Sequence, residues 1–127
     1  MDTTTGAMQT GWLQDKGVWY LLNGQGYMET GWKQSGGKWY LLAESGAMIT
    51  GWAKSGGSWY YLSESGAMKQ GWLQSGNTWY YLHGSGEMVT GWKEVGGKWY
   101  FFYSDGSMAA NTTIGGYELG SSGAWVQ

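Results

Sequence analysis

A single pattern recurs along this chain every 20 residues, and that recurrence constrains the fold more than any other feature. Gly-Trp begins at residues 11, 31, 51, 71 and 91, and Trp-Tyr begins at residues 19, 39, 59, 79 and 99. A methionine recurs at the same interval from Met8 to Met108. Helical-pair repeats need about 33 residues or more, so this unit must be a smaller element that stacks on copies of itself.

Each unit reads as two short strands joined by a tight turn. Trp32-Lys33-Gln34 and Trp39-Tyr40-Leu41-Leu42 flank Ser35-Gly36-Gly37, where glycine supplies the positive φ that a hairpin turn needs. A second glycine-bearing turn, Glu44-Ser45-Gly46-Ala47-Met48, leads to the next unit. An isolated hairpin is only marginally stable in water. We therefore predict an all-β fold, a solenoid of stacked β-hairpins.

We predict that residues 1–127 form a single repeat array. Full repeats cover 11–30, 31–50, 51–70, 71–90 and 91–110, while residues 1–10 are the connector of a truncated repeat. Residues 111–127 form a degenerate capping repeat, in which Gly123-Ala124-Trp125 matches Gly46-Ala47-Met48. Tyr117 then stands where the tryptophan of Trp-Tyr would be. An atypical last unit is expected because terminal repeats cap the stack.

Composition argues against several classes of function. The formal net charge is -2 and no basic stripe is present, so we expect no nucleic-acid partner. No apolar stretch is long enough for a membrane span, and the absence of cysteine rules out thiolate metal ligands. His83 is the single histidine, and the carboxylates hold no fixed position through the repeats. We therefore expect no catalytic activity, no cofactor and no metal site.

The tryptophans are the candidates for a binding function. The chain holds 11 Trp and 10 Tyr but only 2 Phe, and both tryptophans of the unit occur in all five full repeats. A core position tolerates other apolar residues at modest cost, which indicates that the indole itself is required, although pure packing is the alternative. Indole faces attract cations, by about 0.5–2 kcal/mol per ring, and a methionine can complete a cage around a quaternary ammonium. Sugar stacking is the competing interpretation, and it would need polar side chains in register beside the ring.

The pattern Gly-Trp-x-x-x-x-x-x-Trp-Tyr-Tyr-Leu-x-x-x-Gly-x-Met resembles the choline-binding repeat, or cell-wall-binding repeat, of streptococcal surface proteins, pneumococcal autolysins and phage lysins. The resemblance runs from about Gly6 to Trp125. It implies a left-handed superhelix of hairpins that holds choline or phosphocholine of teichoic and lipoteichoic acids between consecutive hairpins. It further implies a non-catalytic module that anchors a larger secreted protein, such as a cell-wall hydrolase, at the bacterial surface. Glucan-binding repeats and an engineered or purely structural scaffold are the alternatives.

The resemblance also implies which rings form each cage. The cages would be Trp12 and Trp19 with Trp39 or Tyr40; Trp32, Trp39 and Trp59; Trp52, Trp59 and Trp79; Trp72, Trp79 and Trp99; and, fifth, Trp92, Trp99 and Tyr117. Each second-strand tryptophan would then serve two neighbouring cages. The predicted choline-binding residues are Trp12, Trp19, Trp32, Trp39, Trp52, Trp59, Trp72, Trp79, Trp92, Trp99, Tyr40, Tyr60, Tyr80, Tyr100, Tyr117, Met28, Met48, Met68 and Met88. The terminal repeats also offer a surface for a homodimer.

Overall fold

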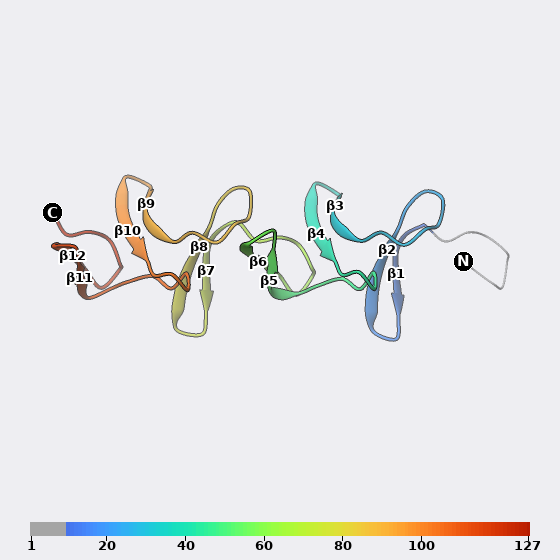
Figure 1. Cartoon of the computed structure of the whole chain (residues 1–127), viewed down its shortest axis with the longest axis horizontal. Helices are drawn as coiled ribbons and strands as arrows, with labels where there is room; N and C mark the ends of the chain where they lie inside the picture. The colour runs from blue at the N-terminus through green and yellow to red at the C-terminus, as the bar shows by residue number, and fades with distance from the viewer. Residues whose placement is uncertain (1–9) are drawn as a thin grey trace. The chain divides into compact units, whose positions relative to one another are not determined.

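A computed structural model describes residues 10–127, which form strands and turns and no helix. Consecutive strands pair into two-stranded sheets, each a hairpin (Figure 1). The strands are β1 (Gly11–Asp15), β2 (Val18–Leu22), β3 (Gly31–Ser35), β4 (Lys38–Leu42), β5 (Gly51–Ser55), β6 (Ser58–Leu62), β7 (Gly71–Ser75), β8 (Thr78–Leu82), β9 (Gly91–Val95), β10 (Lys98–Phe102), β11 (Thr112–Ile114) and β12 (Tyr117–Leu119). The prediction of an all-β chain of successive hairpins is confirmed. None of the described residues forms a helix long and apolar enough to cross a membrane.

The chain divides into two compact units. The first unit comprises Met1–Lys54, of which residues 10–54 are described, and Tyr61–Met68. The second comprises Ser55–Tyr60 and Lys69–Gln127. Hairpins β1–β2 and β3–β4 therefore belong to the first unit, and β7–β8, β9–β10 and β11–β12 belong to the second. Most of the predicted truncated repeat, residues 1–10, lies outside the described residues.

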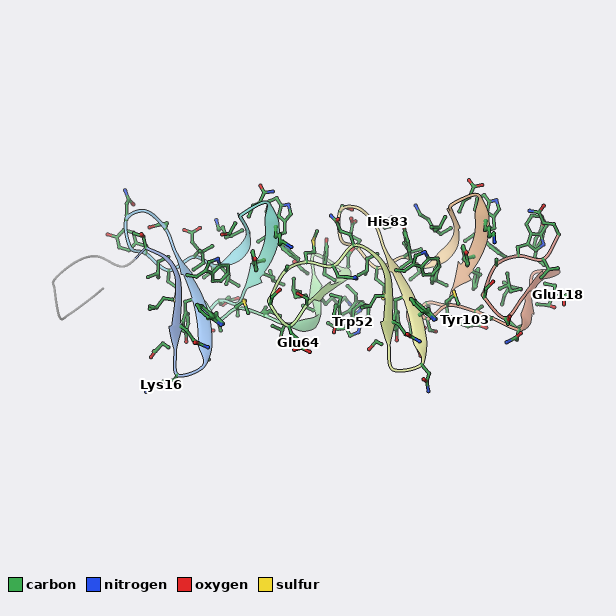
Figure 2. The ribbon with its side chains drawn as sticks, turned by 180° about the vertical axis from the view of Figure 1, so that it is seen from behind. Lys16, Trp52, Glu64, His83, Tyr103 and Glu118 are labelled. Atoms are coloured by element: carbon green, nitrogen blue, oxygen red, sulfur yellow. The ribbon has the colours of Figure 1, made fainter. Side chains whose placement is uncertain are left out.

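Two-residue turns close the hairpins as the glycine pairs predict. In β3–β4, Ser35 is paired with Lys38, which leaves Gly36 and Gly37 as the loop with φ of 59° and 81°. Two successive positive φ values define the hairpin turn whose twist matches that of the strands. The first hairpin places Lys16 at the same point with φ of 53°, and Figure 2 shows this residue at the hairpin tip.

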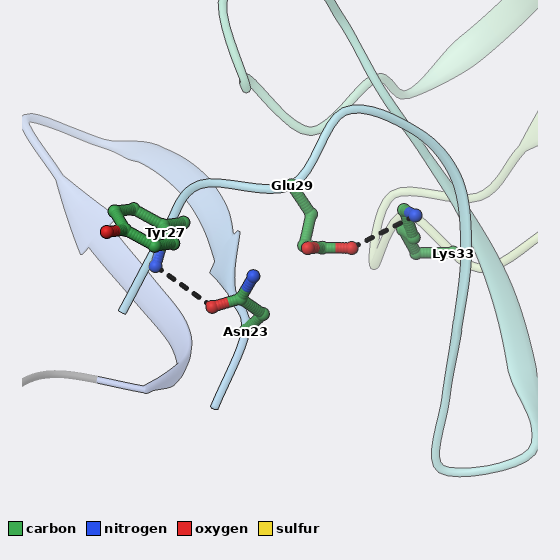
Figure 3. Close-up of polar contacts among 4 residues, drawn as sticks. All are labelled: Asn23, Tyr27, Glu29 and Lys33. Atoms are coloured by element: carbon green, nitrogen blue, oxygen red, sulfur yellow. Dashed lines mark hydrogen bonds and ion pairs between the residues drawn. The ribbon is translucent and has the colours of Figure 1, made fainter. Parts of the chain in front are cut away.

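The connectors between hairpins are held by local polar contacts. After β2, the side-chain Oδ1 of Asn23 accepts a hydrogen bond from the backbone N–H of Gln25 at 2.9 Å. It also accepts one from the backbone N–H of Tyr27 at 3.0 Å, which Figure 3 shows. Glu29 and Lys33 then form an ion pair of 3.1 Å at the entry to β3. These contacts reverse the chain and lead it to the next hairpin.

A recurrent backbone hydrogen bond ties each connector from that of Met48 onward to the hairpin that precedes its own. The amide of Met48 donates to the carbonyl oxygen of Trp19 at 2.8 Å, while Met48 also forms a β-bridge with Leu42 of its own hairpin. Within each unit the same bond recurs for Met68 to Trp39, Met88 to Trp59, Met108 to Trp79 and Trp125 to Trp99, at 2.8–2.9 Å. Consecutive hairpins are therefore joined through the backbone as well as through side chains.

The core is spread along the chain, and its most buried large side chains occur once in most hairpins. The last residue of the second strand is 0–2% exposed in most hairpins. These residues are Leu42 and Leu62 in the first unit, and Leu82, Phe102 and Leu119 in the second. Burial of one such side chain contributes roughly 1.5–3 kcal/mol, so each repeat adds its own increment of stability.

A methionine of one connector lies against the glycine of the next. Gly66 has φ of 90°, and a Cβ atom built on it would lie 3.0 Å from Cε of Met48. The same relation holds for Gly46 with Met28, Gly106 with Met88 and Gly123 with Met108. The connector glycine is therefore required for its positive φ and also for the space that the methionine fills.

Candidate functional site

Strand alternation sorts the aromatic rings of a hairpin onto two faces. In β1–β2, Trp12 is paired with Leu21 and Gln14 with Trp19, so the two tryptophans are diagonal neighbours on one face. In β4, Tyr40 lies two residues before the buried Leu42 and thus on the face opposite to Trp39. A gap between consecutive hairpins is therefore walled by two tryptophans of one and by a tyrosine of the next.

The first cavity lies in the first unit and has this composition. Trp12, Trp19, Tyr40, Met48 and Ser65 line a volume of about 250 Å³. The rings of Trp12 and Tyr40 meet edge to face, with centroids 4.8 Å apart and planes at 66°. The indole Nε1–H of Trp12 donates to Oγ of Ser35 at 3.2 Å, which fixes the ring at the cavity wall. Trp19 is 39% exposed, so its face is available to a ligand and is not packed in a core.

The fourth cavity, in the second unit, repeats this arrangement. Trp72, Trp79, Tyr100, Met108 and Ser122 line a volume of about 410 Å³. The ring of Trp72 is nearly perpendicular to that of Trp79, at 87°, and lies at 75° to that of Tyr100. The two cavities take equivalent residues from different repeats, and both are walled by three rings, a thioether and a hydroxyl.

A terminal cavity of about 260 Å³ is lined by Trp92, Trp99, Tyr117 and Trp125. The β-bridge of Leu119 with Trp125 corresponds to that of Phe102 with Met108 in the preceding repeat. This bridge aligns Tyr117 with Tyr100, whereas the sequence had suggested a place equivalent to Trp99. Tyr117 therefore supplies the tyrosine wall of this cavity.

The structure corrects the expected sharing of tryptophans between cages. Of the two residues predicted for the first cavity, Tyr40 and not Trp39 lines it, and Tyr100 takes the place expected for Trp99 in the fourth. Among the cavities described, the terminal one is the only one that Trp99 lines. The reason is that alternation places the tyrosine and the tryptophan on opposite faces of the strand, and the hairpins stack with the tyrosine toward the preceding hairpin.

The remaining predicted residues lie at equivalent strand positions. The second and third predicted cages would draw on residues of both units and remain predictions. Their aromatic residues are Trp32 on β3, Trp39 on β4, Trp52 on β5, Trp59 and Tyr60 on β6, and Trp79 and Tyr80 on β8. Trp39 and Trp59 are each 41% exposed, like the second-strand tryptophans of the described cavities. Met68 and Met88 lie in the connectors that follow β6 and β8.

The methionine walls are only partly those expected. The sequence predicts methionine walls without assigning each to a cage; Met48 lines the first cavity, whereas Met28 lies against Gly46 and lines none of the three cavities described. Sequence reasoning missed Met108 and Trp125, although the 20-residue series and the Gly-Ala-Trp match contained the signal. It also missed Ser65 and Ser122, which enter from a later connector.

No carboxylate lines any of these three cavities. Glu64, His83 and Glu118 lie on separate segments in Figure 2, and residues 10–127 hold no cluster of three side chains that could bind a metal. The backbone of His83 closes its connector, donating to Glu87 at 2.9 Å and accepting from Gly86 at 2.8 Å. Hydrogen bonds from Ser107 lower the pKa of the exposed Asp105, its side-chain hydroxyl contributing most.

Comparison with solved structures finds close likeness among pneumococcal proteins. CbpJ from Streptococcus pneumoniae is 52% identical with a TM-score of 0.96, over 99% of this chain and 44% of that protein. Choline binding protein F from the same organism is 52% identical with a TM-score of 0.92, over 97% and 42%. The modular autolysin LytC is 35% identical with a TM-score of 0.78, over 93% and 28%. The chain thus spans less than half of each of these proteins.

Comparison with curated protein sequences found no match. Among family models, that of the choline-binding repeat matches residues 29–70, 49–90 and 89–118. A second, that of the cell wall binding repeat, matches residues 10–28. Together these matches cover residues 10–28 and 29–118, and so all cavity residues described above except Ser122 and Trp125. The chain belongs to the family of choline-binding repeats.

Proposed function

We propose that the cavities between consecutive hairpins bind choline, free or as phosphocholine on teichoic and lipoteichoic acids. The observation that carries the proposal is the composition of the cavities: three aromatic rings, of which Trp12 and Trp72 meet their neighbours edge to face at 66–87°, with a methionine and no carboxylate. Such walls attract a trimethylammonium group through the electron-rich faces of the rings. They neutralise no charge, so the binding of each single group is weak.

The hydroxyl groups at the cavity walls suit the rest of the ligand. Ser65 lines the first cavity and Ser122 the fourth, and both residues are exposed. A hydroxyl there can donate a hydrogen bond to a phosphate oxygen while the rings hold the cation. This pairing of an apolar cage with a polar group is the usual design of a small-ligand site, where a few polar groups set orientation.

We infer that the module anchors a larger protein to the bacterial cell wall without itself catalysing a reaction. Several weak sites on one chain, facing a polymer that carries many choline groups, bind together far more tightly than any site alone. The gain comes from effective concentration, which is in the millimolar range for short flexible links. Binding through the terminal repeats of two copies, as a homodimer, would add to this effect.

Titration of the chain with choline, read by tryptophan fluorescence, tests the proposal. We expect a saturable change, because the second-strand tryptophans are 38–41% exposed and bound ligand would cover them. Dextran serves as the matched control for a sugar-binding repeat. A response to dextran without one to choline would replace the proposal with glucan binding, and no response to either would leave only a structural scaffold.

A further inference from the structure

The terminal cavity differs from the first and fourth cavities in one wall and in having no serine in its lining. Its fourth wall is the indole of Trp125, where those cavities have the thioether of Met48 or Met108. The backbone makes the positions equivalent. The amide of Trp125 donates to the carbonyl of Trp99 at 2.8 Å, as that of Met108 does to Trp79. The last repeat therefore has an aromatic wall in place of the methionine wall, held by the same backbone hydrogen bond.

The rings of this cavity stand as walls and are not stacked in a core. The plane of Tyr117 lies at 80° to that of Trp92 and at 88° to that of Trp125, with centroids 5.6 Å and 5.2 Å apart. Trp92 and Trp99 are each 38% exposed and Tyr117 is 48% exposed. The nearby core position is filled separately by Leu119, which is 1% exposed. Because Leu119 already fills the core at this end of the chain, the indole of Trp125 is not needed there.

We propose that the terminal cavity is the tightest quaternary-ammonium site among the three cavities, and that it recognises the cation alone. The inference rests on the proposed function. An indole face attracts a cation more strongly than a thioether does, and the volume of about 260 Å³ is close to the 250 Å³ of the first cavity. No serine lines the terminal cavity, so a phosphate on the ligand lacks there the serine hydroxyl that Ser65 and Ser122 offer in the other two cavities, while a tyrosine hydroxyl is common to all three.

These differences predict two measurable preferences. One additional ring corresponds to binding about twofold to thirtyfold tighter, and exchange for a methionine wall reduces this to roughly fivefold. The terminal cavity should bind tetramethylammonium and phosphocholine with similar affinity. The first and fourth cavities should prefer phosphocholine, because Ser65 and Ser122 can bond its phosphate.

The experiment follows the indole Nε1–H signals of the full chain by NMR during separate titrations with tetramethylammonium, choline and phosphocholine. The test variant is Trp125→Met, which installs the residue that earlier repeats carry at this position and so preserves the fold. Met108→Leu is the matched control, because it changes one wall of the fourth cavity and adds no ring. We expect the Trp92 and Trp99 signals to shift at about fivefold lower tetramethylammonium than those of Trp72 and Trp79. We expect Trp125→Met, but not Met108→Leu, to abolish that difference.

Each other outcome overturns the inference in a distinguishable way. Equal affinities in the wild-type chain, or an unchanged difference in Trp125→Met, would refute the role of the fourth ring while leaving choline binding intact. A phosphocholine preference at Trp92 and Trp99 equal to that at the other cavities would refute recognition of the cation alone. Concentration-dependent self-association that protects Trp125 from ligand would assign the cavity to a dimer contact. No response at any indole would refute the proposed function itself.

Discussion

Gly66→Ala tests whether the connector glycine is conserved from repeat to repeat for its conformation or for the space it leaves. The new Cβ atom would meet Met48, at 2.9 Å from its Cγ and 3.0 Å from its Cε, and the backbone φ is 90°. A side chain in the left-handed region costs about 1–2 kcal/mol. The methionine must also move, and because its end is flexible we take the low end of the overpacking range, about 1–2 kcal/mol more.

Gly57→Ala isolates the conformational part of that cost. Gly57 has a nearly identical φ of 86°, and a Cβ atom there would have no neighbour within 4 Å. We expect Gly57→Ala to lower the free energy of unfolding by about 1–2 kcal/mol and Gly66→Ala by about 2–4 kcal/mol. Urea denaturation followed by near-ultraviolet circular dichroism measures both. Since Met48 also lines the first cavity, Gly66→Ala alone should weaken choline binding there.

A double-mutant cycle with Met48→Ala completes the test. In the Met48→Ala background the new Cβ of Gly66→Ala meets no methionine, so its cost should fall to that of Gly57→Ala. Equal costs of Gly66→Ala and Gly57→Ala in the wild-type background, or a cycle without coupling, would refute the argument from space. The glycine would then be required for its φ alone.

Three further predictions concern single side chains. Tyr100→Leu should remove choline binding at the fourth cavity, whereas Trp99→Leu should affect the terminal cavity and not the fourth. NMR titration of each variant measures this, and loss of both sites in either variant would show that one residue serves two cavities. Lys33→Ala removes the ion pair drawn in Figure 3 and should change the free energy of unfolding by less than about 0.5 kcal/mol, because exposed pairs contribute little; a larger loss in urea denaturation would show a structural role. Ser107→Ala should raise the pKa of Asp105 toward its ordinary value, because the hydroxyl that stabilises the carboxylate is removed. In the wild type, the lowered pKa adds a little to the stability of the fold at pH values above the unfolded-state pKa, and this stability is lost as the pH falls through the folded-state pKa. An NMR titration of the carboxyl carbon that shows no change would contradict that assignment.

The hairpins could be predicted from the sequence because their determinants are local. The pair Gly36-Gly37 fixes a two-residue turn through two positive φ values, and the flanking strands follow from their alternation and β-forming residues. The end of the second strand can be predicted in the same way, since Leu42 and its equivalents recur shortly after an aromatic run. Each of these signals acts within one unit and needs no knowledge of its neighbours.

The third wall of each cavity could not be chosen in the same way. Alternation places Tyr40 and Trp39 on opposite faces, but it does not say which face meets the preceding hairpin. That choice depends on how one hairpin stacks on the next, which the bond from Met48 to Trp19 fixes across a long stretch of sequence. Ser65 could not be predicted for the same reason, because it lies in a connector that follows both of the hairpins whose rings line the first cavity.

The equal spacing of cavity walls has a genetic consequence. The first and fourth cavities take their two tryptophans, their tyrosine and their methionine at the same intervals along the chain. A recombination event that deletes or duplicates one whole 20-residue unit would therefore join walls that already match. Site number could rise or fall by one at a time while every remaining site keeps its geometry. An array of this kind can adjust its avidity for a polymer in integer steps without passing through a damaged intermediate.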